Sequence, residues 1–227
     1  MKKIGIIIAM DKELAPFLDG GKYKKENVKN LDFYHLKIGK KECVIVKSGV
    51  GKVNAAYATT VLLSKYDVET LVSTGISGGL GENKILSLVA ADKCVQYDVD
   101  TTALGDPLGF VSTVNKIFFE ADKGLTDDFC QKTGAKKAIL ASGDKFVADK
   151  NTQVFLKTYF GAGACDMESG AIAQAAYIAK VPFVVIRCIS DGADDDAALT
   201  FEEMTDRASK ILSDAVTSWI ESLQKKF

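Results

Sequence analysis

The chain has 227 residues, of which 47% are hydrophobic and 26% charged, a composition typical of a soluble globular protein with one sizeable core. Its formal net charge of -1 and its pI near 5.9 give no electrostatic reason to expect nucleic acid or an anionic membrane as a partner. We therefore predict one domain over residues 1–227 that acts on small, neutral molecules.

The first predicted element is a buried strand. Residues 3–9 (KIGIIIA) form a nearly continuous apolar run, which is typical of a strand covered on both faces. Its apolar part is only about six residues long, shorter than the roughly 7 to 15 residues of a signal-peptide core, and Asp11 and Glu13 follow it at once. Since no other stretch approaches the roughly 20 apolar residues of a membrane span, we expect a cytoplasmic protein.

The rest of the chain alternates strands with helices. Strands are predicted within 33–49, with a turn at 39–41, and within 69–75, 87–100, 137–144 and 181–191; helices are predicted at 51–66 and from Thr200 nearly to the end. A loop, GISGGLG (75–81), is expected after the strand at 69–75, and a capping box at Thr200 and Glu203. This pattern predicts an α/β fold, a three-layer α/β/α sandwich around a mixed, largely parallel central sheet.

Scarce residue types narrow the chemistry. His35 is the only histidine and lies in an alternating strand pattern, which nearly excludes a histidine triad or a multi-histidine metal site. Arg187 and Arg207 are the only arginines, so a phosphate clamp is hard to assemble. The five cysteines lack metal-ligand spacing. We predict no metal and no cofactor, and chemistry that depends on carboxylates and backbone groups.

Chemically informative groups follow almost every apolar strand. Glu13 follows the first, Glu168 lies in CDMESG (165–170), and Asp191 ends the last. In open α/β sheets, ligands collect at the carboxyl ends of strands. Singly, Glu13 and Asp191 could be helix or turn caps, and Phe146 a core aromatic. Together, such groups suit the cleavage of a glycosidic bond, although the same inventory fits a protein that only binds a sugar.

The CDMESG motif is predicted to join a strand to a helix. Cys165 to Met167 are expected to end a core strand, and the alanine-rich run from Ser169 onward to form a helix. Glu168 then lies at the junction, at the carboxyl end of the strand where a ligand would bind. Asp166, two residues earlier, is expected to be the supporting residue.

Seven ordered motifs resemble one family. They are IGIIIAMDKEL, KSGVGKVNAA, STGISGGL, SGDKFV, DMESGAIA, PFVVIRCISDGAD and LTFEEM. In this order the chain resembles the bacterial 5′-methylthioadenosine/S-adenosylhomocysteine nucleosidases of the nucleoside phosphorylase superfamily. The resemblance implies a nucleoside phosphorylase-like fold, a homodimer, and phosphate-independent hydrolysis that releases adenine and a 5-thioribose derivative.

The resemblance also implies roles for individual residues. Asp191, supported by Ser190, would be the general acid at adenine N7, and Glu13 would hold and activate the attacking water. Glu168 would accept hydrogen bonds from the ribose hydroxyls. The other implied substrate-binding residues are Arg187 (orienting the Glu168 region), Met167 (against the sugar), Phe146 (stacked on adenine), Val147 (backbone at the base edge), Ser77 and Gly78, and, on the 5′-alkylthio side, Met10, Val50 and Phe201.

Departures from the family pattern leave alternatives open. Ile76 and Ser77 stand where many members have a Ser-Ala pair, and the segment with Thr101, Leu104 and Asp106, which would reach a neighbouring subunit's 5′ pocket, is less aromatic. The alternatives are a nucleoside phosphorylase, an aminodeoxyfutalosine nucleosidase and a non-catalytic nucleoside-binding protein. A phosphorylase is disfavoured because neither arginine lies near IIIAMDKEL, the place of its phosphate loop.

Overall fold

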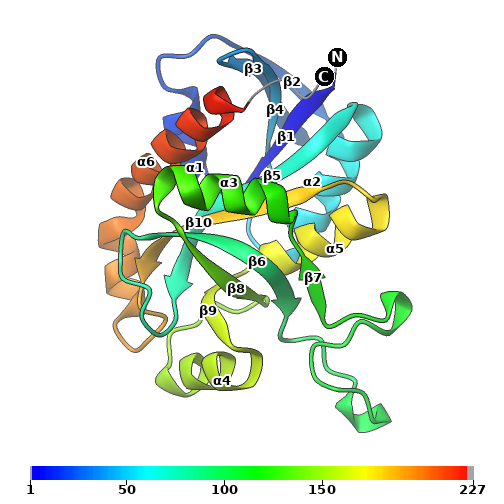
Figure 1. Cartoon of the computed structure of the whole chain (residues 1–227), viewed down its shortest axis with the longest axis vertical. Helices are drawn as coiled ribbons and strands as arrows, with labels where there is room; N and C mark the ends of the chain where they lie inside the picture. Colours follow the sequence, from blue (N-terminus) through cyan, green and yellow to red (C-terminus); the bar gives the residue numbers. More distant parts are fainter. Residues whose placement is uncertain (1, 224–227) are drawn as a thin grey trace.

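The computed structural model describes residues 2–223 and shows helices packed around a central sheet (Figure 1). The strands are β1 (Lys3–Ile8), β2 (Tyr23–Val28), β3 (Leu31–Ile38), β4 (Lys41–Lys47), β5 (Val68–Gly79), β6 (Leu88–Gln96), β7 (Phe118–Glu120), β8 (Lys136–Ser142), β9 (Ala162–Asp166) and β10 (Phe183–Asp191). The α-helices are α1 (Asp11–Leu18), α2 (Lys52–Lys65), α3 (Lys123–Thr133), α4 (Lys150–Phe160), α5 (Ser169–Ala179) and α6 (Ala197–Ser222). Two short 3-10 helices, η1 (Thr102–Leu104) and η2 (Ser112–Val114), lie between β6 and β7.

The sheet is mixed, as predicted, and part of it closes on itself. β1 pairs in parallel with β4 on one side and with β5 on the other. Beyond β4 the sheet continues with two antiparallel pairings, first to β3 and then to β2. β10 pairs in parallel with β5 and antiparallel with β6, while β8 and β9 lead from β6 back to β5. The five strands β5, β10, β6, β8 and β9 therefore form a ring, an arrangement that no local sequence pattern indicates.

Apolar side chains cover both faces of the sheet. Along β1, Ile7 packs into a cluster with Ile172 of α5, whereas Ile6 points the other way, into a cluster with Trp219 of α6. Successive residues of a strand face opposite sides, so a strand between two helical layers must be apolar throughout. The sandwich thus explains the continuous apolar run at residues 3–9. Within residues 2–223, no helix has the length and apolarity needed to cross a membrane.

Two predicted boundaries are wrong. The loop expected at 75–81 is largely strand, because β5 continues to Gly79 and keeps pairing with β10 and then β9. The capping box expected at Thr200 is absent, since α6 begins at Ala197 and the Thr200 hydroxyl donates to the Asp196 carbonyl within the first turn (3.1 Å). The predicted end of this helix, at residues 224–227, lies outside the described residues.

Candidate active site

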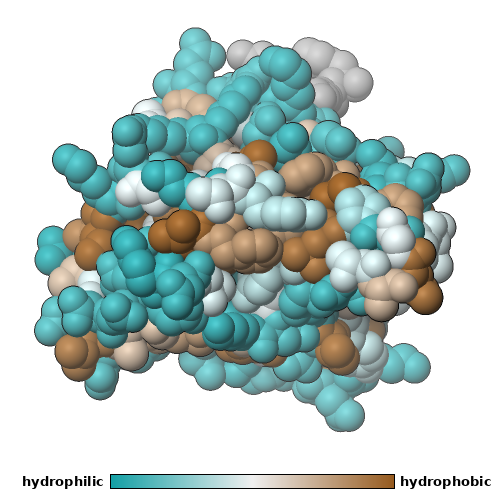
Figure 2. All heavy atoms as spheres, turned by 90° about the horizontal axis from the view of Figure 1, so that it is seen from below, coloured by the Kyte–Doolittle hydropathy of each residue, from teal (hydrophilic) through white to brown (hydrophobic). Residues whose placement is uncertain are grey.

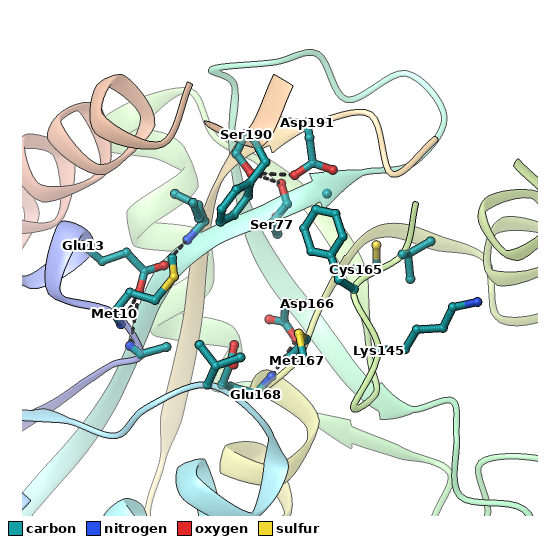
Figure 3. A pocket seen from close by; sticks show the side chains of 17 residues that line it. Met10, Glu13, Ser77, Lys145, Cys165, Asp166, Met167, Glu168, Ser190 and Asp191 are labelled. Atoms are coloured by element: carbon teal, nitrogen blue, oxygen red, sulfur yellow. Dashed lines mark hydrogen bonds between the residues drawn. The ribbon is translucent and has the colours of Figure 1, made fainter. Parts of the chain in front are cut away.

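A pocket of about 150 Å³ opens at the carboxyl ends of β1, β5, β9 and β10 (Figure 3). It brings together every predicted site residue except Arg187. The lining residues are Ala9, Met10, Glu13, Val50, Ile76, Ser77, Gly78, Lys145, Phe146, Val147, Cys165, Asp166, Met167, Glu168, Ser190, Asp191 and Phe201.

Glu13 is buried in the first turn of α1. Its Oε2 accepts backbone N–H groups from Ala9 (3.2 Å) and Met10 (2.9 Å), and its Oε1 accepts the N–H of Ile76 in β5 (2.8 Å). Burial raises the pKa of Glu13, while these amides and the charge of Arg187 oppose that rise. Because backbone amides only donate, both carboxylate oxygens are held as acceptors, the state required of a base.

Asp191 is the last residue of β10 and is also buried. Its Oδ2 accepts the hydroxyl of Ser190 (2.8 Å), and its Oδ1 accepts the N–H of Ala193 (2.9 Å). Burial raises the pKa of Asp191 more than these two donors lower it. The carboxyl group can therefore hold a proton at a higher pH than a solvent-exposed aspartate can.

Glu168 lies between β9 and α5, at the junction that the sequence predicts. Its Oε1 accepts the N–H of Gly51, which precedes α2 (2.8 Å). Burial, reinforced by the charge of Asp166, raises the pKa of Glu168 to about 7. The group is therefore a buried acceptor that titrates near neutral pH.

Arg187 does not line the pocket but fixes the chain beside it. Its Nε donates to Asp166 Oδ2 (2.9 Å), and its Nη2 donates to the hydroxyls of Ser73 (3.0 Å) and Ser169 (2.9 Å). Asp166 Oδ1 in turn accepts the backbone N–H groups of Glu168 (3.3 Å) and Ser169 (3.1 Å). Arg187 thus orients the turn that carries Glu168, and Asp166 is a supporting residue.

A second, smaller cavity lies behind the main pocket. It measures about 10 Å³ and is bounded by Glu13, Glu168 and Arg187, together with Ser48 and Ser73. A space of this size holds roughly one water molecule, provided that polar partners surround it. The two cavities share Glu13 and Glu168, so a water held here would lie next to whatever fills the larger pocket.

Part of the pocket lining is apolar. This part includes Met10, Val50 and Phe201, and the rings of Phe146 and Phe201 meet edge to face with their centroids 5.4 Å apart. Phe146 and Val50 are partly exposed, which places them towards the mouth. This part can receive an apolar group and an aromatic ring, whereas the carboxylates can bind hydroxyls and exchange protons.

Some lining residues fall outside the predicted set: Ala9, Ile76, Lys145, Cys165 and Asp166. Each lies within two residues of a predicted residue, so the rule that ligands bind at strand ends could have found them. Burial raises the pKa of the Cys165 thiol, which disfavours the nucleophilic thiolate. Within the described part of the chain, no group of three or more His, Cys, Asp or Glu side chains could hold a metal ion.

The chain is similar to known proteins over nearly its whole length. Residues 3–221 match the family model of the phosphorylase superfamily. An aminodeoxyfutalosine nucleosidase of Campylobacter jejuni is 34% identical over 98% of this chain and 100% of its own length. A 5′-methylthioadenosine/S-adenosylhomocysteine nucleosidase of Staphylococcus haemolyticus is 35% identical over 97% of this chain and 100% of its own.

A solved structure is similar over nearly the whole chain. It is the 5′-methylthioadenosine/S-adenosylhomocysteine nucleosidase of Helicobacter pylori, complexed with a pyrrolidin-3-ol that carries an aminopyrrolopyrimidine group. The TM-score is 0.94 at 31% identity, and the match covers 98% of this chain and 99% of the other.

Proposed function

The chain belongs to the phosphorylase superfamily, and on that premise we propose that it hydrolyses the N-glycosidic bond of 5′-methylthioadenosine and S-adenosylhomocysteine without phosphate. The products are adenine and the corresponding 5-thioribose derivative. One observation carries the proposal: two buried carboxylates, Glu13 and Asp191, face one pocket but are held by different donors. Hydrolysis of a nucleoside requires such a pair, one group to protonate the leaving base and one to activate water.

Asp191 is the proposed general acid. Adenine leaves poorly as an anion, and a proton delivered to N7 lowers the cost of breaking the C–N bond. The raised pKa keeps a larger fraction of Asp191 protonated near neutral pH than is usual for an aspartic acid. Ser190 and the Ala193 amide hold the carboxyl group in place and would stabilise the carboxylate that remains after proton transfer.

Glu13 is the proposed base, and the small polar cavity is the proposed place of the water. That cavity is lined by Glu13, a possible acceptor for the water, and by Arg187, whose guanidinium carries donors. Glu13 would take the water's proton as the oxygen attacks the sugar carbon. Because burial raises the pKa of Glu13, its carboxylate is a stronger base than one in solvent.

Glu168 is the proposed partner of the ribose hydroxyls. Its Oε1 is bound to the Gly51 amide, and its other oxygen has no hydrogen bond to the described residues and remains available to a ligand. Met167 would pack against the sugar, Phe146 would stack on adenine, and the Val147 backbone would contact the edge of the base. Met10, Val50 and Phe201 would surround the 5′-alkylthio group.

We also propose that the protein works as a homodimer. A groove of about 470 Å³ runs between α2 and α5, and Val53 and Ile178, which are 80% and 60% exposed, lie along it. Leu104 of η1 is 82% exposed. Figure 2 shows apolar side chains across the middle of the face seen from below, bordered by hydrophilic ones. Solvent-exposed apolar clusters of this kind are typical of protein interfaces.

In such a dimer the segment with Leu104 would reach the 5′ pocket of the partner. The apolar mouth formed by Val50 and Phe146 would then be covered on binding. We further propose a cytoplasmic location, which the five unpaired cysteines support, since disulfides are rare in reducing compartments.

The decisive experiment measures adenine release without phosphate. The protein is incubated separately with 5′-methylthioadenosine, S-adenosylhomocysteine, adenosine and 6-amino-6-deoxyfutalosine. We expect turnover of the first two. A kcat/KM for aminodeoxyfutalosine well above both would instead favour the activity named for the Campylobacter relative. No release of adenine from any substrate would contradict the enzyme proposal. With phosphate added, formation of the corresponding ribose 1-phosphate or 5-substituted ribose 1-phosphate faster than hydrolysis would indicate a phosphorylase.

A further inference from the structure

The hydroxyl of Ser77 is buried and has no partner. Within residues 2–223, Ser77 Oγ is one of four buried side-chain oxygens or nitrogens that make no hydrogen bond, the others being Thr74 Oγ1, Tyr97 Oη and Ser209 Oγ. Ser77 is 4% exposed and lines the pocket, and its backbone carbonyl accepts the Ser190 hydroxyl (3.3 Å). Since buried hydroxyls nearly always bind something, one at a pocket wall indicates an atom of the ligand.

The register of β5 shows which side of the pocket Ser77 faces. β5 and β10 pair without interruption from Leu71 to Ser77, so Ser73, Gly75 and Ser77 share one face. The Ser73 hydroxyl accepts from Arg187, and a Cβ added at Gly75 would lie 2.7 Å from Glu13 Oε1. Ser77 is therefore the next position in a row that faces the proposed base.

The acid lies on the other side of the same strand. A Cβ added at Gly78, which points away from the Ser77 face, would lie 3.0 Å from Asp191 Oδ1. Figure 3 shows Ser77 close to both Ser190 and Asp191 at this end of β5. The Asp191 carboxyl group and the Ser77 hydroxyl thus reach the pocket from opposite sides of one strand end.

This geometry points to one atom of the substrate: we propose that the Ser77 hydroxyl donates a hydrogen bond to purine N3. The inference depends on the proposed function, in which Asp191 contacts N7, the Val147 backbone contacts the outer edge of the base, and Glu168 contacts the ribose hydroxyls. N7 and N3 lie on opposite sides of N9, the atom that leaves. Among the ring nitrogens of adenine that can accept a hydrogen bond, N3 is the one to which the proposed function assigns no partner.

The contact would stabilise the leaving group. As the C–N bond breaks, its electron pair moves to the base, and negative charge grows at N9 and N3. A donor at N3 is worth more in that state than in the bound substrate, while the proton itself still comes from Asp191. Donation to the ribose ring oxygen would have the opposite effect, because it would withdraw the lone pair that stabilises the oxocarbenium ion.

The test is a cycle of two variants and two substrates. Ser77→Ala removes the hydroxyl, and Ser209→Ala removes another buried, unpartnered serine hydroxyl from α6, outside the pocket. Each is assayed with 5′-methylthioadenosine and with its 3-deaza analogue, which has CH in place of N3. We expect S77A to lower kcat/KM for the natural base roughly 3- to 10-fold, the usual effect of one hydrogen bond, and to leave the analogue nearly unchanged.

The outcomes separate this inference from the proposed function. S209A should match the wild type on both substrates, and S77A should not lower the melting temperature of the free protein, because its hydroxyl has no partner to lose. Equal losses on both substrates, no loss on either, or a melting temperature several degrees lower would overturn the N3 contact. A wild type that releases no base from 5′-methylthioadenosine would overturn the enzymatic proposal instead.

Discussion

At the scale of residues, the environment separates the roles of similar carboxylates. Glu13 accepts three backbone amides, whereas Asp191 accepts one amide and one hydroxyl. Glu168 accepts a single amide and is close to the charge of Asp166. All three are buried, so in the proposed mechanism their surroundings, and not their exposure, distinguish the acid, the base and the group that binds ribose.

Replacing the proposed acid should strongly reduce turnover and spare binding. Asp191→Asn cannot donate a carboxylic proton to the leaving base, so we expect kcat to fall by roughly 100-fold or more. Glu13→Gln, which cannot accept a proton from water, should cause a loss of similar size. Adenine release gives kcat, and calorimetric titration gives the affinity for 5′-methylthioadenosine.

Asp195→Asn is the matched control for this pair. Asp195 is exposed and follows Asp191 in the same loop, so its substitution should leave kcat unchanged. A near-wild-type kcat in D191N or in E13Q would disprove the role assigned to that residue.

At the scale of elements, β5 supports both ends of the site. Its amide at Ile76 holds Glu13, and the glycines on either side leave room for the carboxylates of Glu13 and Asp191. Alanine at position 75 or 78 would place a Cβ within 3.0 Å of one of these groups. The glycine content of this strand is therefore a steric requirement of the pocket.

Gly75→Ala should therefore reduce activity without unfolding the protein. The added Cβ would lie 2.7 Å from Glu13 Oε1 and displace it, and a misplacement of about 1 Å can lower a rate roughly 100-fold. Gly21→Ala is the control, since its Cβ would meet nothing closer than 3.6 Å. Both variants are compared in kcat/KM and in circular dichroism. Wild-type activity in G75A would mean that the position of Glu13 is not critical.

The sequence predicts elements well where the signal is local. The apolar run at 3–9 and the change from strand to alanine-rich helix around Glu168 both appear in the structure as predicted. The glycines at 75, 78 and 79 predict a loop but belong to a strand. They are needed there because atoms from distant parts of the chain lie too close to leave room for a Cβ. The sequence does not predict the ion pair between Arg187 and Asp166 or the pairing of β10 with β6. Both depend on tertiary packing, which produces no pattern in the local sequence.

At the scale of the whole molecule, three buried acids should make the free protein less stable as the pH rises. The pKa values of Glu13, Glu168 and Asp191 are all raised by burial. Between the unfolded and folded pKa values, the folded state binds more protons than the unfolded state, so the free energy of unfolding falls with increasing pH.

For Glu168 this pH range runs from 4.5 to about 7. Across it, the free energy of unfolding should fall by on the order of 3 kcal/mol. The unliganded protein should therefore melt at a higher temperature at pH 5 than at pH 7.5. Scanning calorimetry over this range provides the measurement. Glu168→Gln removes one titrating group and should flatten the profile. A melting temperature that rises from pH 5 to 7.5 would contradict this account.

The proposed dimer makes a further prediction at this scale. Charges introduced by Val53→Glu and Ile178→Glu together should repel across a face that would otherwise be buried, and the double variant should sediment as a monomer. Its KM for 5′-methylthioadenosine should rise, because the partner's Leu104 segment no longer covers the pocket. Val154→Glu, on the exposed side of α4, should leave the dimer intact. A wild type that sediments as a monomer would exclude the interface.

Closure of the strand ring also determines when the enzyme can first act during its synthesis. Glu13 emerges early from the ribosome, but the strand that carries Asp191 is the last of the ring, and it must insert between β5 and β6. A nascent chain that has not yet reached residue 183 therefore contains the proposed base but not the proposed acid, and its ring is open. We expect the ability to cleave nucleosides to arise in one late step, close to the completion of translation.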